Sequence, residues 1–212
     1  MYRPDPFRET DAHKLVAFMR AHPFGTLVAA PEGRPIAAHI PIAIATDGET
    51  ITLSGHVARA NPIWQTFDGD EALIIFSGPH AYISPQAYEK RESVPTWNYI
   101  AVHAYGVPRA VHFSEAAESM NDMMARLMDS FESAYGEQWA SLPSGFRTNL
   151  MQGIVGFEIS VSRLEGQYKL SQNRSAQDQT NVAANLVQAR DPATVAIGEA
   201  MQRNIDLAQQ DR

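Results

Sequence analysis

Alternating apolar and polar residues indicate several short β-strands in the first third of the chain. Residues 25–30 and 35–45 flank the turn-forming run 31–34, which predicts a hairpin. Residues 46–49 turn the chain again, and residues 50–56 alternate with a period of two. We therefore expect an antiparallel meander of three strands.

Three later segments continue the strand pattern. Residues 71–77 form an apolar run that leads into a stretch, residues 76–99, punctuated by three prolines. Residues 99–113 predict a long strand or a bent pair, with Gly106 and Pro108 at a bulge or edge. Residues 154–164 alternate cleanly and are expected to form the last strand.

Helical spacing predicts helices around this sheet. Thr10 is the expected cap of a helix ended by Pro23, and Asn61 is the expected cap of a one- or two-turn helix. Ser114 is the expected cap of the strongest helix, whose apolar stripe predicts core contacts (Met120, Met124, Leu127, Met128, Phe131). Segments 175–190 and 191–206 are helical with narrow apolar faces, which suggests packing on a partner subunit or frayed ends. The fold class is mainly β with peripheral helices (α+β).

Length and composition narrow the class of protein. A chain of 212 residues with 44% apolar residues predicts one domain, residues 1–190, followed by a C-terminal helical tail, residues 191–212. The net charge of -7 disfavours direct DNA binding, and the absence of cysteine excludes disulfides and thiolate metal sites. Neither a signal peptide nor a membrane-spanning run is visible, so we expect a soluble, cytoplasmic protein without membrane attachment.

Polar and aromatic residues gather in residues 76–99 beyond what packing requires. The prolines hold five of them on a stiff path: His80, Tyr82, Ser84, Trp97 and Asn98. Ligand binding and a crossover whose aromatics cover a barrel explain this stretch about equally well. The same two kinds of explanation apply to residues 59–62 and 168–174, each of which is either an anion site or a solvated turn.

Other site chemistries receive little support from the sequence. The seven histidines include no pair at metal-binding helical spacing, so no metal site is predicted, although His39, His56 and His103 fall in strand-like segments that could share one face. No nucleophile elbow, P-loop or dinucleotide-binding glycine pattern is present.

Five sequence blocks carry a resemblance to a known family. They are G-H-V-A-R-A-N-P-I-W, F-S-G-P-H-A-Y-I-S-P, V-P-T-W-N-Y-I-A-V-H, I-V-G-F-E-I and K-L-S-Q-N-R, beginning at residues 55, 76, 94, 154 and 169. In this order they resemble the PaiB-type family, also called FMN-binding negative transcriptional regulators. The resemblance runs from Met1 to about Leu186.

The resemblance implies a split β-barrel of the FMN-binding type, related to flavin reductases and pyridoxamine phosphate oxidases. It also implies a homodimer with cofactor sites at the subunit interface. By analogy the phosphate of FMN falls on Ser54, His56, Arg59 and Asn61, and the isoalloxazine falls near His80, Tyr82, Ser84, Trp97 and Asn98. Lys169, Ser171, Gln172 and Arg174 would contribute from the far end of the barrel or from the second subunit. Catalytic residues stay unassigned.

The function implied is a flavin-dependent redox or sensing protein that acts on regulation indirectly through a small-molecule ligand or partner, with a flavin-dependent oxidoreductase activity left open. One alternative is a haem-binding or haem-degrading barrel that uses His39, His56, His80 or His103 as axial ligand. The other is a DNA-binding repressor, which the charge and the lack of a helix-turn-helix pattern disfavour.

Overall fold

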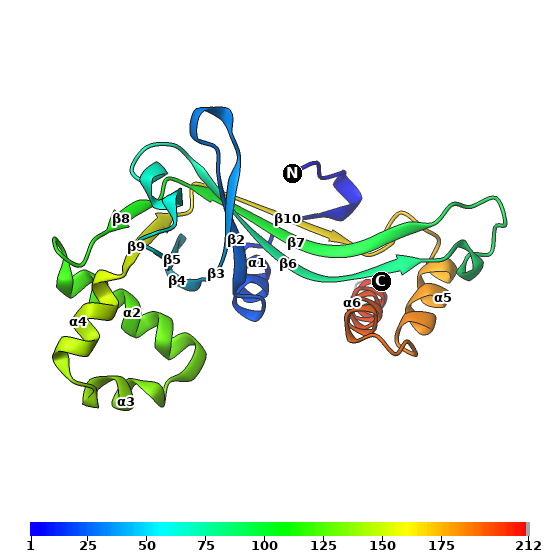
Figure 1. Ribbon diagram of the computed structural model, residues 1–212. Coiled ribbons are helices and arrows are strands. Elements are labelled where there is room, and N and C mark those ends of the chain that lie inside the picture. The colour runs from blue at the N-terminus through cyan, green and yellow to red at the C-terminus, as the bar shows by residue number, and fades with distance from the viewer. Residues whose placement is uncertain (211–212) are drawn as a thin grey trace. The chain divides into compact units, whose positions relative to one another are not determined.

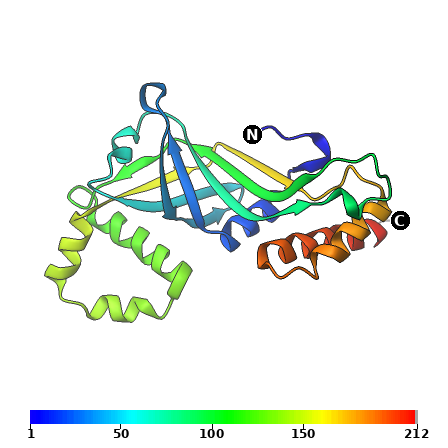
Figure 2. The same ribbon diagram turned by 45° about the vertical axis from the view of Figure 1, so that its right-hand side comes forward.

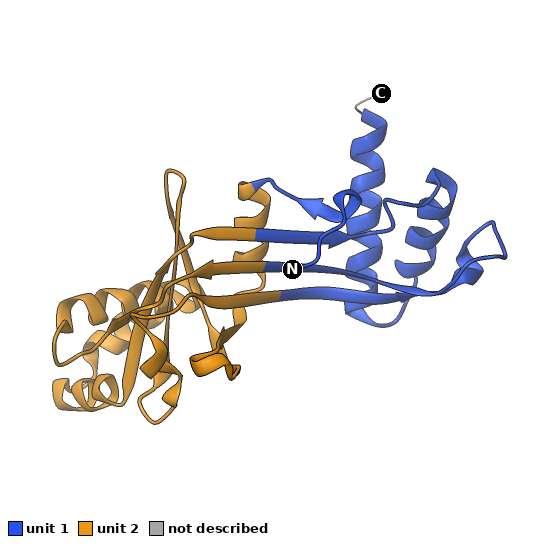
Figure 3. Cartoon of the chain, turned by 90° about the horizontal axis from the view of Figure 1, so that it is seen from above, with its two compact units in different colours: residues 1–11, 77–102, 165–212 blue, residues 12–76, 103–164 orange. Residues whose placement is uncertain are grey.

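The computed structural model describes residues 1–210 as two compact units, shown in blue and orange in Figure 3. Unit 1 comprises residues 1–11, residues 77–102 and the chain from residue 165 onward. Unit 2 comprises residues 12–76 and 103–164. The domain boundary expected at residue 190 stays a prediction.

The strands form two sheets (Figure 1). The first has the order β1-β10-β7-β6-β2-β3 and the second the order β4-β5-β9-β8. The pairs β2–β3, β4–β5 and β5–β9 are antiparallel. The strands are β1 Arg8–Glu9, β2 Phe24–Ala29, β3 Ile36–Pro41, β4 Ala43–Asp47, β5 Thr50–Ala58, β6 Ala72–Ile83, β7 Thr96–Gly106, β8 Arg109–Val111, β9 Ile154–Ser160 and β10 Arg163–Lys169.

The predicted three-stranded meander is wrong at its second strand. Residues 35–45 form β3 and β4, which belong to different sheets, and only the hairpin of β2 with β3 is confirmed. Ile42 lies between the two strands, is fully buried, and donates its N–H to the Pro23 carbonyl at 2.9 Å. This bond extends the β2–β3 register by one residue, and directly after it the chain enters β4, which pairs with β5 in the other sheet.

Two other strand predictions change. β6 continues to Ile83, so residues 76–83 of the 76–99 stretch belong to a strand that was predicted to end at residue 77. The alternating segment 154–164 is not the last strand, because the chain turns after β9 and β10 follows it. Residues 99–113 were expected to form either a long strand or a bent pair, and they form the pair, β7 and β8, which lie in different sheets.

Unit 2 carries the helices α1 Ala12–Ala21, α2 Ala117–Glu132, α3 Tyr135–Ser141 and α4 Ser144–Gln152, and the short turns η2 Pro31–Gly33 and η3 Pro62–Thr66. The core role predicted for the apolar stripe is confirmed at Met120 and Leu127, which are buried, whereas Met124 and Met128 are only partly buried. Met123, which the predicted stripe omitted, is fully buried with Met120 and Met151. The far end of the stripe is not core, because Phe131 is half exposed. Ser114 is not the cap either, since Ala116 precedes α2 without a side-chain hydrogen bond.

Unit 1 carries α5 Ala176–Leu186 and α6 Pro192–Gln210, with the turns η1 Asp5–Phe7 and η4 Pro85–Ala87. The two helices lie side by side in Figures 1 and 2 and pack on each other. A Cβ added at Gly198 would lie 2.8 Å from the Val187 backbone nitrogen, so the glycine permits this close approach. Their apolar faces look narrow in the sequence because alanine and glycine supply part of the contact (Ala183, Gly198, Ala200).

Within residues 1–210, no helix has both the length and the apolar character needed to cross a membrane.

Candidate functional site

An exposed group of ring side chains lies on β6 and β7 within unit 1. Tyr82 and Trp97 are 51% and 53% exposed, and their ring centroids are 5.9 Å apart in an edge-on arrangement. The ring of His80 lies at the same distance from Trp97. We call His80, Tyr82 and Trp97 the aromatic face. The exposed Trp97 ring offers a flat apolar surface of the kind that binds planar ligands, and the Tyr82 ring, edge-on to it, borders that surface.

The residue after Trp97 points to the other side of the sheet, because side chains alternate along a strand. Asn98 is completely buried, and its amide donates to the Ser171 hydroxyl at 2.9 Å and lies 3.4 Å from the Met201 sulfur of α6. Its Oδ1 atom is buried without a hydrogen-bond partner. Asn98 and Ser171 therefore join β7 to the turn after β10 and to α6, on the side away from the aromatic face.

The K-L-S-Q-N-R block builds that turn. Ser171 adopts a left-handed conformation with φ of 65°, which is uncommon for a residue with a Cβ. The Gln172 side chain accepts a hydrogen bond from the Leu170 N–H and donates to the Tyr168 carbonyl, so it bridges the turn from within. Gln172 therefore stabilises the turn, and the ligand-binding role expected for it stays a prediction.

The two cations of the block are also engaged within unit 1. Lys169 donates to the Thr96 hydroxyl and to the Trp97 carbonyl, which fixes the start of β7 beside the aromatic face. Burial and the nearby charge of Arg174 lower the pKa of Lys169. The Arg174 guanidinium lies over the Tyr88 ring, 4.2 Å from its centroid. Lys169 and Arg174 therefore both make contacts that stabilise the segments next to the aromatic face.

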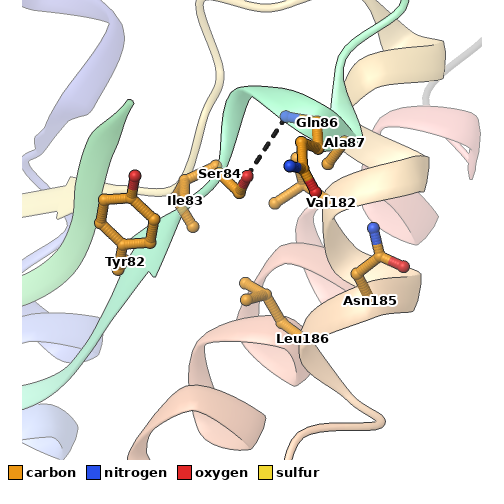
Figure 4. A pocket seen from close by; sticks show the side chains of 8 residues that line it. All are labelled: Tyr82, Ile83, Ser84, Gln86, Ala87, Val182, Asn185 and Leu186. Carbon is orange, nitrogen blue, oxygen red and sulfur yellow. Dashed lines mark hydrogen bonds between the residues drawn. The ribbon is translucent and has the colours of Figure 1, made fainter. Parts of the chain in front are cut away.

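A pocket of about 320 Å³ adjoins Tyr82 in unit 1 (Figure 4). The Ser84 hydroxyl accepts a hydrogen bond from the Gln86 N–H at 3.2 Å and so caps η4 at the edge of the pocket. The polar groups around it are the neutral side chains of Ser84, Gln86 and Asn185. The lining is Tyr82, Ile83, Ser84, Gln86, Ala87, Val182, Asn185 and Leu186.

Unit 2 holds the other predicted group, at the end of β5. Ser54 is buried, and His56 is half-buried with its Nδ1 atom shielded from solvent and without a partner. Burial lowers the pKa of His56, which keeps the ring neutral at neutral pH. Neutral imidazole can bind a ligand by hydrogen bonding but contributes no positive charge toward a phosphate.

Arg59 is the exposed cation of this group and is tied to the end of α4. Its Nε atom donates to the Gln152 carbonyl at 2.7 Å, and its terminal nitrogen donates to the Ile154 carbonyl at 3.2 Å. A guanidinium has five N–H donors, so two bonds leave others for an anion. Asn61 caps η3, since its side chain accepts a hydrogen bond from the Ile63 N–H at 3.1 Å, which confirms the predicted cap.

The four histidines considered for haem or metal binding lie on four different strands: His39 on β3, His56 on β5, His80 on β6 and His103 on β7. His39 shares a hydrogen bond of 2.9 Å with the Thr26 hydroxyl, and His103 lies next to Tyr105. In the described part of the chain, no three His, Cys, Asp or Glu side chains are arranged to hold a metal ion.

Comparison with known families assigns the chain. Residues 1–163 match the family described as "Putative FMN-binding domain". The chain belongs to this FMN-binding family. It is 37% identical over 203 residues to the Bacillus subtilis "Protease synthase and sporulation protein PAI 2", covering 95% of this chain and 97% of that protein. The PaiB-type resemblance is therefore confirmed.

Solved structures show the same fold. The FAD and haem binding protein of Mycobacterium smegmatis superposes with a TM-score of 0.58 at 15% identity, covering 84% of this chain and 79% of that one. The flavocytochrome Anf3 of Azotobacter vinelandii gives a TM-score of 0.58 at 13% identity, covering 79% and 72%. The predicted split-barrel fold of flavin-binding proteins is confirmed.

The thirteen predicted site residues divide between the two units. Ser54, His56, Arg59 and Asn61 belong to unit 2, and the other nine belong to unit 1. Their contacts with a cofactor stay predictions. Tyr99 was not among the predicted site residues, and its hydroxyl accepts a hydrogen bond from Gln167 Nε2 at 2.7 Å. Counting two residues on from Trp97 along the strand would have placed Tyr99 on the same side of the sheet.

Proposed function

We propose that the protein binds FMN with the isoalloxazine ring against the aromatic face of unit 1. The observation that carries the proposal is the pair of half-exposed rings, Tyr82 and Trp97, held 5.9 Å apart on a strand frame. Exposed aromatics of this size are costly to leave in water, and a flat conjugated ring covers them well. The family membership of the chain supports FMN as the planar ligand.

The phosphate contacts are proposed separately, on unit 2. Arg59 supplies the fixed charge there, and its two carbonyl contacts hold the guanidinium in place. The buried, unpartnered Nδ1 of His56 is a further polar atom that a ligand or a small rearrangement could satisfy. When bound, FMN would supply redox chemistry, while the residues of this chain would bind and orient it.

We further propose that the protein acts as a homodimer with FMN at the subunit interface. The half-exposed Tyr82 and Trp97 support this, because a second subunit could cover rings that the single chain leaves in solvent. The pocket beside Tyr82 would receive the small-molecule ligand or substrate. Its neutral amide and hydroxyl lining favours an uncharged polar molecule.

The proposed effect on regulation is indirect, through redox state or ligand sensing. A net charge of -7 disfavours contact with DNA phosphates. The name of the Bacillus relative refers to protease synthesis and sporulation, which supports a place in regulation. A mobility-shift assay with the upstream DNA of its own gene is expected to show no complex, and a specific complex at moderate salt would overturn the indirect role.

The deciding experiment is the visible absorption spectrum of the purified protein, alone, with added FMN and with added haemin. We expect a flavin spectrum that stays with the protein through gel filtration, at one FMN per subunit and at the mass of a dimer. A protein that retains no FMN contradicts the proposal. Retention of haemin with a sharp Soret band and no flavin would favour the haem alternative.

Replacing Arg59 with alanine is expected to weaken FMN binding by about 1.5–3 kcal/mol, the value of a hydrogen bond to a charged group. It is also expected to lower stability, because the Gln152 and Ile154 carbonyls lose their donor. FMN titration and thermal unfolding separate the two effects. Riboflavin, which lacks the phosphate, should bind the variant and the parent equally. An unchanged FMN affinity would place the phosphate elsewhere.

A further inference from the structure

A small cavity in unit 2 gathers hydrogen-bond donors that have no partner in the protein. It lies between α2 and α4, has a volume of about 140 Å³, and is lined by Phe113, Asn121, Ser144, Arg147, Thr148 and Met151. Four of these residues come from α4 at positions 144, 147, 148 and 151. This spacing of three, four and seven places them on one face of the helix.

Arg147 is the decisive residue of this cavity. Its Nε atom is shielded from solvent and has no hydrogen-bond partner. Within residues 1–210 its side chain makes no ion pair, although arginines 109 and 126 of the same unit both bond to Glu158. Arg147 is partly buried, and a shielded donor without an acceptor is costly, so an acceptor from outside the chain would be favoured at its Nε atom.

The other polar side chains of the cavity match the same kind of ligand. Ser144 and Thr148 offer hydroxyls, Asn121 offers an amide, and none of the lining residues is acidic. No hydrogen bond joins these three side chains to another described residue. The first turn of α4 adds a small positive contribution from the helix dipole. Together with Arg147, four donor side chains line this space: Asn121 and Ser144 are exposed at its edge, and Arg147 and Thr148 are partly buried.

We propose that this cavity binds a small tetrahedral oxyanion of the phosphate type. Four separate donors suit the four oxygens of phosphate better than the two oxygens of a carboxylate, and guanidinium pairs well with phosphate. The buried Met151 and the partly buried Phe113 form an apolar floor that limits the ligand to a small group. None of the residues proposed for FMN lines the cavity, although Arg59 donates to the Gln152 carbonyl at the end of the same helix.

Isothermal titration with inorganic phosphate, against chloride of equal ionic strength, tests the proposal. We expect saturable binding that weakens at least tenfold in Arg147→Gln and severalfold in Thr148→Val. The matched control is Arg203→Gln, which removes an exposed helical arginine of unit 1 and should leave the affinity unchanged. Acetate should bind more weakly than phosphate, and titration with glycerol phosphate shows whether the site accepts an ester as well as the free ion.

Phosphate could also enter the site proposed for FMN, so Arg59→Gln and the FMN-loaded protein are titrated in parallel. Full loss of phosphate binding in Arg59→Gln, with Arg147→Gln unaffected, would overturn the proposal. Absence of phosphate binding by the parent protein would overturn it as well. If Arg147→Gln does not fold, Ser144→Ala and Thr148→Val carry the test, and unchanged affinity in both contradicts the site. The FMN proposal stands or falls independently, on the retained flavin spectrum.

Discussion

Replacing Trp97 with alanine is expected to weaken FMN binding by about 5- to 150-fold. Stacking of a flat heterocycle on an aromatic side chain contributes about 1–3 kcal/mol, which corresponds to this range of dissociation constants. Trp97 is the largest ring of the aromatic face, and Tyr82 and His80 both contact it. Its removal therefore deletes the ring on which the flavin would stack and also deletes the packing partner of the Tyr82 and His80 rings.

Titration of the apoprotein with FMN, followed by quenching of flavin fluorescence, measures this effect. Phe131→Ala is the matched control, because Phe131 is an aromatic residue of 51% exposure on α2 in unit 2. Trp97→Phe should keep most of the affinity, since it retains a flat ring. Thermal unfolding should show a modest loss of stability in Trp97→Ala, since about half of this large side chain is buried. An affinity equal to that of the parent would show that the flavin does not lie on this face.

Replacing Gly106 with alanine is expected to lower the free energy of unfolding by about 3 kcal/mol or more, at the upper end of the usual cost of overpacking. A Cβ at this position would lie 2.5 Å from the carbonyl oxygen of Ser160 and 2.5 Å from Cγ2 of Ile159. Ser160 is fixed in β9 by its pairing with Thr52 of β5. Because the obstacle is backbone, a rotamer change cannot relieve it.

Urea unfolding measured by circular dichroism tests the Gly106 prediction. Gly136→Ala is the control, since nothing lies within 4 Å of a Cβ added at this helical glycine of α3. That change should raise stability by about 0.5–1 kcal/mol, because alanine loses less backbone entropy in a helix. Equal stability of Gly106→Ala and the parent would mean that β7 and β9 separate more readily than their packing indicates.

The two proposals concern different units of the chain. The aromatic face belongs to unit 1 and the phosphate-type cavity to unit 2. Because Trp97 does not line the cavity, Trp97→Ala should change the affinity for flavin without changing the affinity for inorganic phosphate. A protein that senses both a flavin and an oxyanion would combine two metabolic signals, which fits an indirect role in regulation.

The sequence determined the type and place of most strands, because alternation with a period of two requires only the residues themselves. Asn61 could be recognised as a cap for the same reason, since the capping bond to Ile63 spans two residues. The five sequence blocks pointed to the family and the cofactor class, and the family match confirms that membership. All of these conclusions rest on local chemistry or on sequence similarity.

The tertiary structure decided which candidate side chains are free to meet a ligand. Trp97 and Asn98 are neighbours in the same block, yet one is half exposed and the other is buried under α6. Gln172 and Arg174 look like ligand donors in the sequence, but a turn and the Tyr88 ring occupy them. The sequence also did not show that residues 35–45 divide at Ile42 into two strands of different sheets. Burial and partners of a side chain depend on residues far along the chain, and a linear pattern does not contain those contacts.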